Sequence, residues 1–372
     1  MATRDLHDHP FDDGTITKLE IFENYAKEWL PTFVMSYPDK ELWIFDFFAG
    51  TGRDINGIAG SPIRLLQQVK AQSGNIFNKK CKIHMCLNEF EKEKYNLLQK
   101  CCDEFVKNDS ELARLSDTYL FLHYRNCDFA ELFPKTLTTI SANPSLVLLD
   151  QNGMKFLADK YLLDLEGLSQ TDFLYFLSSS YFIRFGETEA FQTNLKIDIN
   201  RIKENPYKYV HKSILEQLKC KLPNNSKLKL YPFTIKKGAN IYGIIFGAKH
   251  PRAVDKFLKT AWDKNNINGE ANFDIDDDLK KVQLSLFDGK LPTKIERFQN
   301  ELQEKLIQGI LRTNKEVYDY TLECGHLPTH SSDKIKQMKK EGIIDYNEKS
   351  PLINYEQVYK KNRIVIYKIV KK

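Results

Sequence analysis

The segment from Leu42 to Gly52 places the strongest constraint on what this chain can fold into. It reads LWIFDFFAGTG, an apolar run that ends in Asp46 and then turns through Gly50 and Gly52. Glycine tolerates positive φ and allows close approach of the backbone to a ligand, so the pattern predicts a first β-strand entering a ligand-binding loop. A dinucleotide fingerprint needs a third glycine, and Ile55 stands in its place. The alternative is a glycine turn that binds nothing.

Apolar runs alternate with amphipathic segments along the first 250 residues. We expect strands at Leu42–Phe47, Cys81–Leu87, Thr118–Tyr124, Ser145–Leu149, Asp172–Leu177 and Tyr242–Phe246. Helices are predicted at Thr17–Met35, Ser61–Val69 and Glu91–Phe105. This alternation predicts an α/β protein with a mostly parallel, doubly wound sheet, in other words a Rossmann-like fold.

A polar residue lies at or just after the end of each of five predicted strands. These residues are Asp46, Glu89, Asp128, Asp150 and Ser178. The carboxyl ends of parallel strands lie at one edge of a sheet, and doubly wound sheets bind their ligands there. We therefore expect these side chains to form one polar rim.

The spacing Asp-x-Phe-x-Gly-x-Gly resembles the first motif of class I S-adenosylmethionine-dependent methyltransferases. That resemblance implies an S-adenosylmethionine cofactor, with Gly50 and Gly52 against it. Asp46 is expected to orient the glycine loop rather than to touch a substrate.

Three further residues are candidates for cofactor contacts. The Glu89 carboxylate can accept hydrogen bonds from both ribose hydroxyls, although it can also be a solvent-facing loop acid. Asp128 can accept a bond from the adenine amino group or can cap the helix that follows it. Lys18 can pair with the cofactor carboxylate, although the pattern alone favours an ordinary exposed lysine on a helix.

Asp150-Gln151-Asn152-Gly153 follows a fully apolar strand, where class I methyltransferases hold the methyl acceptor. We assign Asp150 and Asn152 to the acceptor, as candidate catalytic residues. Enzymes that methylate exocyclic amines of nucleic acids typically have Asp/Asn-Pro-Pro-aromatic here. This chain lacks both prolines and the aromatic residue, and no Pro-Cys nucleophile is visible. The alternative is a turn that only ends the strand.

The C-terminal part of the chain differs in charge and pattern. We expect a methyltransferase-like domain over residues 1–268, a linker over 269–293 and a winged helix-turn-helix domain over 294–372. The last domain is predicted from helices at Glu296–Leu311, Lys315–Glu323 and Thr329–Glu341, followed by strands at Ile343–Ile344 and Arg363–Val370.

The basic surplus of the chain lies in this last domain. From residue 291 onward there are 16 Lys and Arg against 11 Asp and Glu. The difference, 16 − 11 = +5, equals the net charge of the whole chain. A basic domain on a neutral body indicates an acidic partner such as DNA or RNA, although a solvated lysine-rich surface gives the same count. The candidate contacts are Lys334, Lys336, Lys339 and Lys340.

His250 and Arg252 follow another apolar strand. Arg252 suits bidentate binding of a phosphate, so the pair is a candidate for substrate or nucleic-acid contact. The alternative is a surface turn before a helix.

Composition narrows the class of protein further. No apolar stretch approaches the ~18 residues of a membrane span, and the N-terminus lacks the apolar region of a signal peptide. Seven cysteines without a Cys-x-x-Cys pair predict a reduced cytoplasmic protein. Cys81, His84 and Cys86 lie close together but lack a second ligand pair, so we expect no metal site.

The ordered set of motifs resembles the three-Cys-motif partner (TcmP) family of bacterial proteins. The segments that carry the resemblance are 17–22, 45–52, 60–62, 88–89, 148–153 and 246–251. The resemblance implies a methyltransferase-like Rossmann domain and a radical-S-adenosylmethionine-like partner that carries the three-cysteine motif. It also implies a bacterial mobile or antiviral defence locus.

Two functions are therefore expected from the sequence. The first is a methyltransferase-like protein that acts on or with nucleic acid. The second is a catalytically inactive Rossmann scaffold or sensor that recruits a partner enzyme.

Overall fold

The computed structural model describes residues 10–36, 39–150, 159–179, 182, 186–284 and 291–370. The chain forms two compact units, Met1–Lys249 and His250–Lys372. This division is one of packing, and the domain boundaries expected at residues 268 and 294 stay a prediction. Within the described ranges, no helix is both long enough and apolar enough to cross a membrane.

A seven-stranded sheet forms the centre of the first unit. Its spatial order is β3-β2-β1-β4-β5-β7-β6, in which β1 to β5 are parallel and β7 is antiparallel to both of its neighbours. The strands are β1 Glu41–Asp46, β2 Lys82–Asn88, β3 Leu120–Arg125, β4 Ser145–Leu149, β5 Thr171–Ser178, β6 Lys229–Lys237 and β7 Asn240–Ala248. The predicted α/β doubly wound class is confirmed. The strand order with one antiparallel strand near the edge is that of the class I methyltransferase fold.

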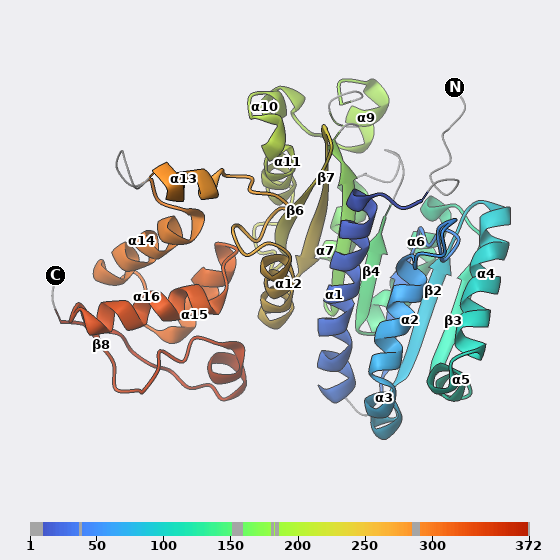
Figure 1. Ribbon diagram of the computed structural model, residues 1–372, viewed down its shortest axis with the longest axis horizontal. Helices are drawn as coiled ribbons and strands as arrows, with labels where there is room; N and C mark the ends of the chain where they lie inside the picture. The colour runs from blue at the N-terminus through green and yellow to red at the C-terminus, as the bar shows by residue number, and fades with distance from the viewer. Residues whose placement is uncertain are drawn as a thin grey trace. The chain divides into compact units, whose positions relative to one another are not determined.

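Helices cover both faces of this sheet. One set lies in front of the strands in Figure 1: α1 Asp13–Ser36, α2 Ser61–Ala71, α3 Ser73–Lys79, α4 Lys92–Lys107 and α5 Ser110–Ser116. The opposite face carries α6 Phe129–Ala142, α7 Asp159–Glu166 and α11 Val210–Lys219, whose side chains share one buried cluster. Two short helices, α9 Glu189–Asn194 and α10 Ile199–Lys203, precede α11.

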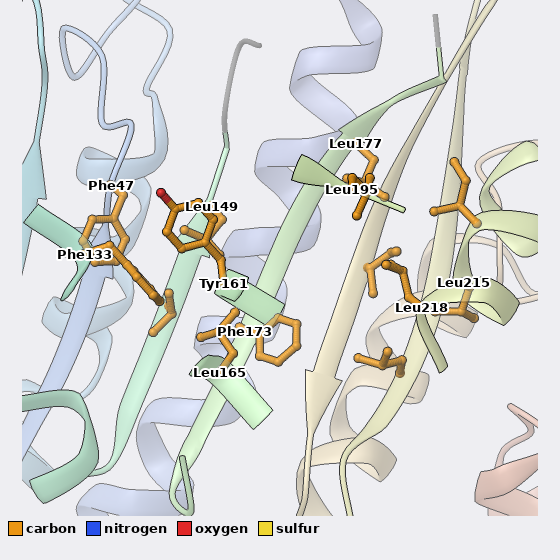
Figure 2. Close-up of a cluster of buried hydrophobic side chains, with 14 of the residues drawn as sticks. Phe47, Phe133, Leu149, Tyr161, Leu165, Phe173, Leu177, Leu195, Leu215 and Leu218 are labelled. Atoms are coloured by element: carbon orange, nitrogen blue, oxygen red, sulfur yellow. The ribbon is translucent and has the colours of Figure 1, made fainter. Parts of the chain in front are cut away.

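The buried cluster on this second face is rich in aromatic side chains (Figure 2). Phe47 meets Phe129 edge to face with ring centroids 5.3 Å apart, and Phe129 meets Tyr161 in the same way at 5.0 Å. Each fully buried large side chain contributes roughly 1.5–3 kcal/mol to folding. Because Phe47 directly follows β1, this packing fixes the start of the glycine loop.

Helix α1 is fastened to the amino end of β5 by a buried polar contact. The Tyr25 hydroxyl donates to Asp172 Oδ2 at 2.7 Å, and Asp172 is only 5% exposed. Burial raises the pKa of Asp172 to about 7. A buried acid with a hydrogen-bond partner is tolerated in a core, whereas an unpaired charge is not.

Strand β6 is the strand of the central sheet that the sequence patterns missed. It lies at the edge of the sheet and contains Pro232, which pairs in register with Ile245 of β7. Proline lacks the N–H that a central strand needs, so it is restricted to edges, and it also weakens the sequence signal for a strand.

The second unit contains a helical core and a small antiparallel pair of strands. Its elements are α12 Pro251–Lys264, α13 Asp278–Leu284, α14 Lys294–Ile307, α15 Asn314–Glu323, α16 Pro328–Lys340, a π-helical turn Glu356–Lys360, β8 Ile344–Asp345 and β9 Lys368–Ile369. Capping boxes at Thr293/Glu296 and Thr313/Glu316 set the starts of α14 and α15. The three predicted helices are confirmed within four residues at each end, and the paired part of the last strand is shorter than expected.

Candidate functional site

The loop after β1 adopts a conformation that requires glycine. Gly50 and Gly52 have φ values of 63° and 85°. A Cβ added to Gly52 would lie 3.0 Å from Cys101 Sγ of α4, so Cys101 would have to shift by a few tenths of an ångström to admit it. The sequence LWIFDFFAGTG therefore forms the tight strand-to-helix turn that it predicts.

Asp46 links the end of β1 to the loop and to α2. It is 1% exposed, its Oδ1 accepts from the Phe48 N–H at 3.2 Å, and its Oδ2 accepts from Ser61 Oγ at 2.6 Å. Burial, together with a smaller contribution from the nearby charge of Asp150, raises the pKa of Asp46 to about 7. Both carboxylate oxygens bond to protein groups, which is the arrangement of a residue that orients a loop.

Glu89 closes the loop from the neighbouring strand. Its Oε2 accepts from the Gly50 N–H at 3.1 Å, and its Oε1 accepts from the Glu91 N–H at 2.9 Å. A carboxylate oxygen has two lone-pair directions, so each oxygen keeps one acceptor site for another donor. Phe90 lies directly after it and is 66% exposed. An exposed ring beside this carboxylate is a feature that our sequence reasoning missed, although the Glu-Phe pair after an apolar strand was visible.

Two asparagines hold the ends of neighbouring strands together. Asn88, 2% exposed, donates through Nδ2 to the carbonyls of Phe47 and Cys127, each at 3.1 Å. Asn126 donates to the carbonyls of Glu89 and Phe90, each at 2.7 Å. These amides connect the ends of the strands at the rim, and no sequence pattern predicted their partners.

Asp128 lies at the start of α6, beyond β3. Its Oδ1 accepts from the Ala130 N–H at 2.8 Å, so it caps the helix, the alternative considered from the sequence. A contact with adenine stays a prediction for this residue.

Asp150 and Lys18 form a largely buried ion pair at the carboxyl end of β4. Lys18 Nζ lies 2.5 Å from Asp150 Oδ2, with side chains 12% and 14% exposed. The same ammonium lies 4.6 Å from the centre of the Phe176 ring. Asp150 Oδ1 is buried and has no hydrogen-bond partner among the described residues. Asn152 lies outside the described residues.

The described part of the first unit also encloses a cavity of about 30 Å³ within the buried cluster on the face of α7 and α11. Apolar and aromatic side chains line it, including Leu162, Phe173, Leu195 and Ile214. Ligand pockets usually measure ~300–1,000 Å³, so this space is far too small for a nucleoside.

The remaining candidate residues belong to the second unit. His250 caps α12, since its Nδ1 accepts from the Arg252 N–H at 3.2 Å. On α16, Lys336 and Lys340 are exposed, whereas Lys334 is only 7% exposed. Lys339 donates to the Tyr346 carbonyl at 2.5 Å and lies 3.0 Å from Asp345 Oδ1. Two of the four lysines therefore have exposed side chains, and one of these, Lys336, lies 3.6 Å from Asp333 Oδ1.

Comparison with protein families identifies part of the chain. A model of the GMT-like wHTH domain matches residues 273–351, so the chain carries a winged helix-turn-helix domain of that kind. No curated protein gives a significant match.

Comparison with solved structures returns the METTL16 MTase domain. It is 10% identical, with a TM-score of 0.30, and the match covers 62% of this chain and 66% of that one, just under two thirds of its length. A similarity this low carries no argument about the fold or the function. The methyltransferase-like fold of the first unit is established instead by its strand order and glycine loop.

Proposed function

We propose that this protein binds S-adenosylmethionine and is a methyltransferase-like protein that acts on, or together with, nucleic acid. The observation that carries the proposal is the bond from the Gly50 N–H to Glu89, which closes a glycine loop at the carboxyl rim of a class I methyltransferase-like sheet. The winged helix-turn-helix domain supports the nucleic-acid part.

The residues of the rim fit this cofactor. The remaining acceptor sites of Glu89 suit the two ribose hydroxyls, and the exposed Phe90 ring suits the flat face of adenine. Gly50 and Gly52 let the backbone approach closely. When bound, S-adenosylmethionine supplies an electrophilic methyl group on a sulfonium.

Asp150 is the residue proposed to position the methyl acceptor. The Lys18 ammonium balances its charge through Oδ2, which leaves Oδ1 to accept a hydrogen bond from an acceptor N–H or O–H. When Asp150 holds the N–H or O–H of the methyl acceptor in this way, the protein rather than water orients the lone pair on that nitrogen or oxygen. Lys18 in this arrangement is a positioning residue.

Isothermal titration with S-adenosylmethionine and S-adenosylhomocysteine tests the binding claim. We expect a saturating heat signal from the full chain. No signal at ligand concentrations near 1 mM, which corresponds to a binding free energy weaker than about −4 kcal/mol, would contradict it.

A specific observation favours a second candidate function, that of a catalytically inactive scaffold. The carboxylate of Asp150 is already engaged by Lys18, and the sequence after it lacks the Pro-Pro-aromatic of amino-methylating enzymes. In this case the protein recruits its partner, proposed from the sequence resemblance to be a radical-S-adenosylmethionine-like three-Cys-motif protein of a bacterial defence locus.

Co-purification separates the two candidates. A stoichiometric complex that transfers no labelled methyl group to DNA, RNA or the partner supports the scaffold. Methyl transfer that depends on Asp150 supports the enzyme, and an Asp150→Asn variant that still binds the cofactor is the control.

A further inference from the structure

Two tyrosines of the second unit stack on each other. Tyr355 directly precedes the π-helical turn Glu356–Lys360 and Tyr359 lies within it. Their rings are nearly parallel, with an interplanar angle of 14° and centroids 5.8 Å apart. Both side chains are partly exposed. Tyrosine rings in such a position offer area for stacking at little cost in side-chain entropy.

The cationic side chain of Arg252 lies beside Tyr355, at one end of this pair. The Arg252 guanidinium lies 5.4 Å from the centre of the Tyr355 ring, within the range of a cation–π contact. Across the described part of the chain, it makes no hydrogen bond or ion pair, since only its backbone N–H is bonded, to His250. Its donors are thus available to a ligand while the ring fixes its position.

The other end is held rigidly by the protein itself. Lys315 Nζ lies 4.1 Å from the centre of the Tyr359 ring and donates to its hydroxyl at 3.0 Å. The Tyr359 hydroxyl in turn donates to Asp319 Oδ1 at 2.6 Å. Tyr359 therefore fixes the geometry of the pair, and Tyr355 with Arg252 forms its open end.

Nearby charges do not neutralise this open end. Glu356 is already paired with Lys360 at 3.3 Å, and Asp319 lies 3.3 Å from Lys315. His250 lies 5.6 Å from Tyr355 as a hydrogen-bonding group without charge, because burial and the neighbouring Arg252 lower its pKa. Its Nδ1 accepts a bond from the backbone, so the ring proton resides on Nε2, as a further donor.

We propose that Tyr355, Tyr359 and Arg252 form a binding platform for single-stranded nucleic acid, in which a base stacks on Tyr355 and Arg252 contacts the adjacent phosphate. Aromatic rings beside cations bind unpaired bases, because every base has an exposed π-face once it leaves a duplex. The proposal rests on the nucleic-acid part of the proposed function and adds a site separate from the lysines of α16.

Fluorescence anisotropy with a short labelled single strand tests the platform on the full chain. Tyr355→Ala is expected to weaken binding by at least about fivefold, the lower end for loss of one stacked base. Tyr355→Phe is expected to bind like the wild type, because within the described residues the Tyr355 hydroxyl has no bond to lose. Arg252→Gln is expected to weaken binding and to reduce the salt slope by about 0.7, the value for one phosphate on a single strand.

Matched measurements keep the proposal falsifiable. Lys336→Gln, on α16, and a duplex of the same sequence report on the winged-helix surface instead. Unchanged single-strand binding in both Tyr355→Ala and Arg252→Gln would overturn the platform, as would binding that needs a duplex and is lost in Lys336→Gln. These assays contain no cofactor, so a failure to bind S-adenosylmethionine leaves their outcome intact.

Discussion

The two ends of the central sheet each contain a buried aspartate, and the two residues serve different purposes. Asp46 at the carboxyl end and Asp172 at the amino end are 1% and 5% exposed, and burial raises the pKa of each to about 7. Asp172 bonds to Tyr25, a side chain of the core. Asp46 bonds to the glycine loop and to Ser61 at the start of α2. A buried, hydrogen-bonded aspartate thus holds the core together at one end of the sheet and orients the glycine loop at the other.

The largest effect is expected from a side chain in the glycine loop. Gly52→Ala combines positive φ with a Cβ 3.0 Å from Cys101 Sγ, so we expect a loss of about 2–5 kcal/mol in unfolding free energy and no measurable cofactor binding. Urea unfolding and titration calorimetry measure the two quantities.

Gly57 provides the matched control. It also has positive φ, at 77°, but an added Cβ meets nothing within 4 Å. Gly57→Ala should lose only about 1–2 kcal/mol and keep cofactor binding. Equal behaviour of the two variants would show that loop strain, rather than space at Gly52, decides the result.

The two aspartates are separated by their pH dependence and by their effect on binding. Well below pH 4 each aspartate is protonated in both the folded and the unfolded protein. As the pH rises toward 7, the aspartate ionises first in the unfolded protein, because its pKa is raised only in the folded one. Each raised pKa therefore lowers the free energy of unfolding across that pH window. The change from 3.8 to about 7 corresponds to at most about 4 kcal/mol for each acid. Asp46→Asn and Asp172→Asn should each flatten the stability profile from pH 4 to 7.

Only one of these two substitutions should change the affinity for the cofactor. Asp46→Asn is expected to weaken S-adenosylmethionine binding, whereas Asp172→Asn is expected to leave it unchanged. Denaturant titrations at pH 5 and pH 8 measure the stability of each variant, and titration calorimetry measures its affinity for S-adenosylmethionine. Equal loss of affinity in both variants would remove the functional distinction between the two ends of the sheet.

A smaller effect is expected at the end of β2. Glu89→Gln removes a charged acceptor from Gly50 and from the proposed ribose site, so affinity should fall about tenfold or more with little change in stability. Glu41→Gln, at the amino end of β1 and 44% exposed, is the control that should bind normally. A Glu89→Gln variant with wild-type affinity would place the ribose elsewhere.

The smallest effect is expected on α16. Lys336→Gln should reduce the salt slope of duplex binding by about 1, the contribution of a single phosphate contact. Lys82→Gln makes the same charge change on the first unit, and we expect no change in slope. If the two variants shift the slope equally, net charge rather than the winged helix governs binding.

The fold was largely predictable because its signals are local. Strand β4 was predicted at its observed limits, Ser145–Leu149, from five consecutive apolar or small residues, and the glycine loop from one motif. Strand β6 was missed because Pro232 and flanking lysines weaken its pattern, and its place at the sheet edge is a tertiary property.

The candidate site was predictable only in part. Asp46, Glu89 and Asp150 were predicted to lie on one rim because the carboxyl ends of parallel strands meet at one edge of a sheet. The pairing of Lys18 with Asp150 and the cross-strand bonds of Asn88 depend on the side chains that meet after folding. Exposure of Phe90 likewise depends on what the neighbouring helices leave uncovered.

The most direct test is calorimetric titration of the full chain with S-adenosylmethionine, alongside Gly52→Ala and Gly57→Ala. The account predicts one site for the wild type and for Gly57→Ala, and no heat for Gly52→Ala. A wild-type chain that gives no heat near 1 mM ligand, or a folded Gly52→Ala variant that binds as tightly as the wild type, would contradict it.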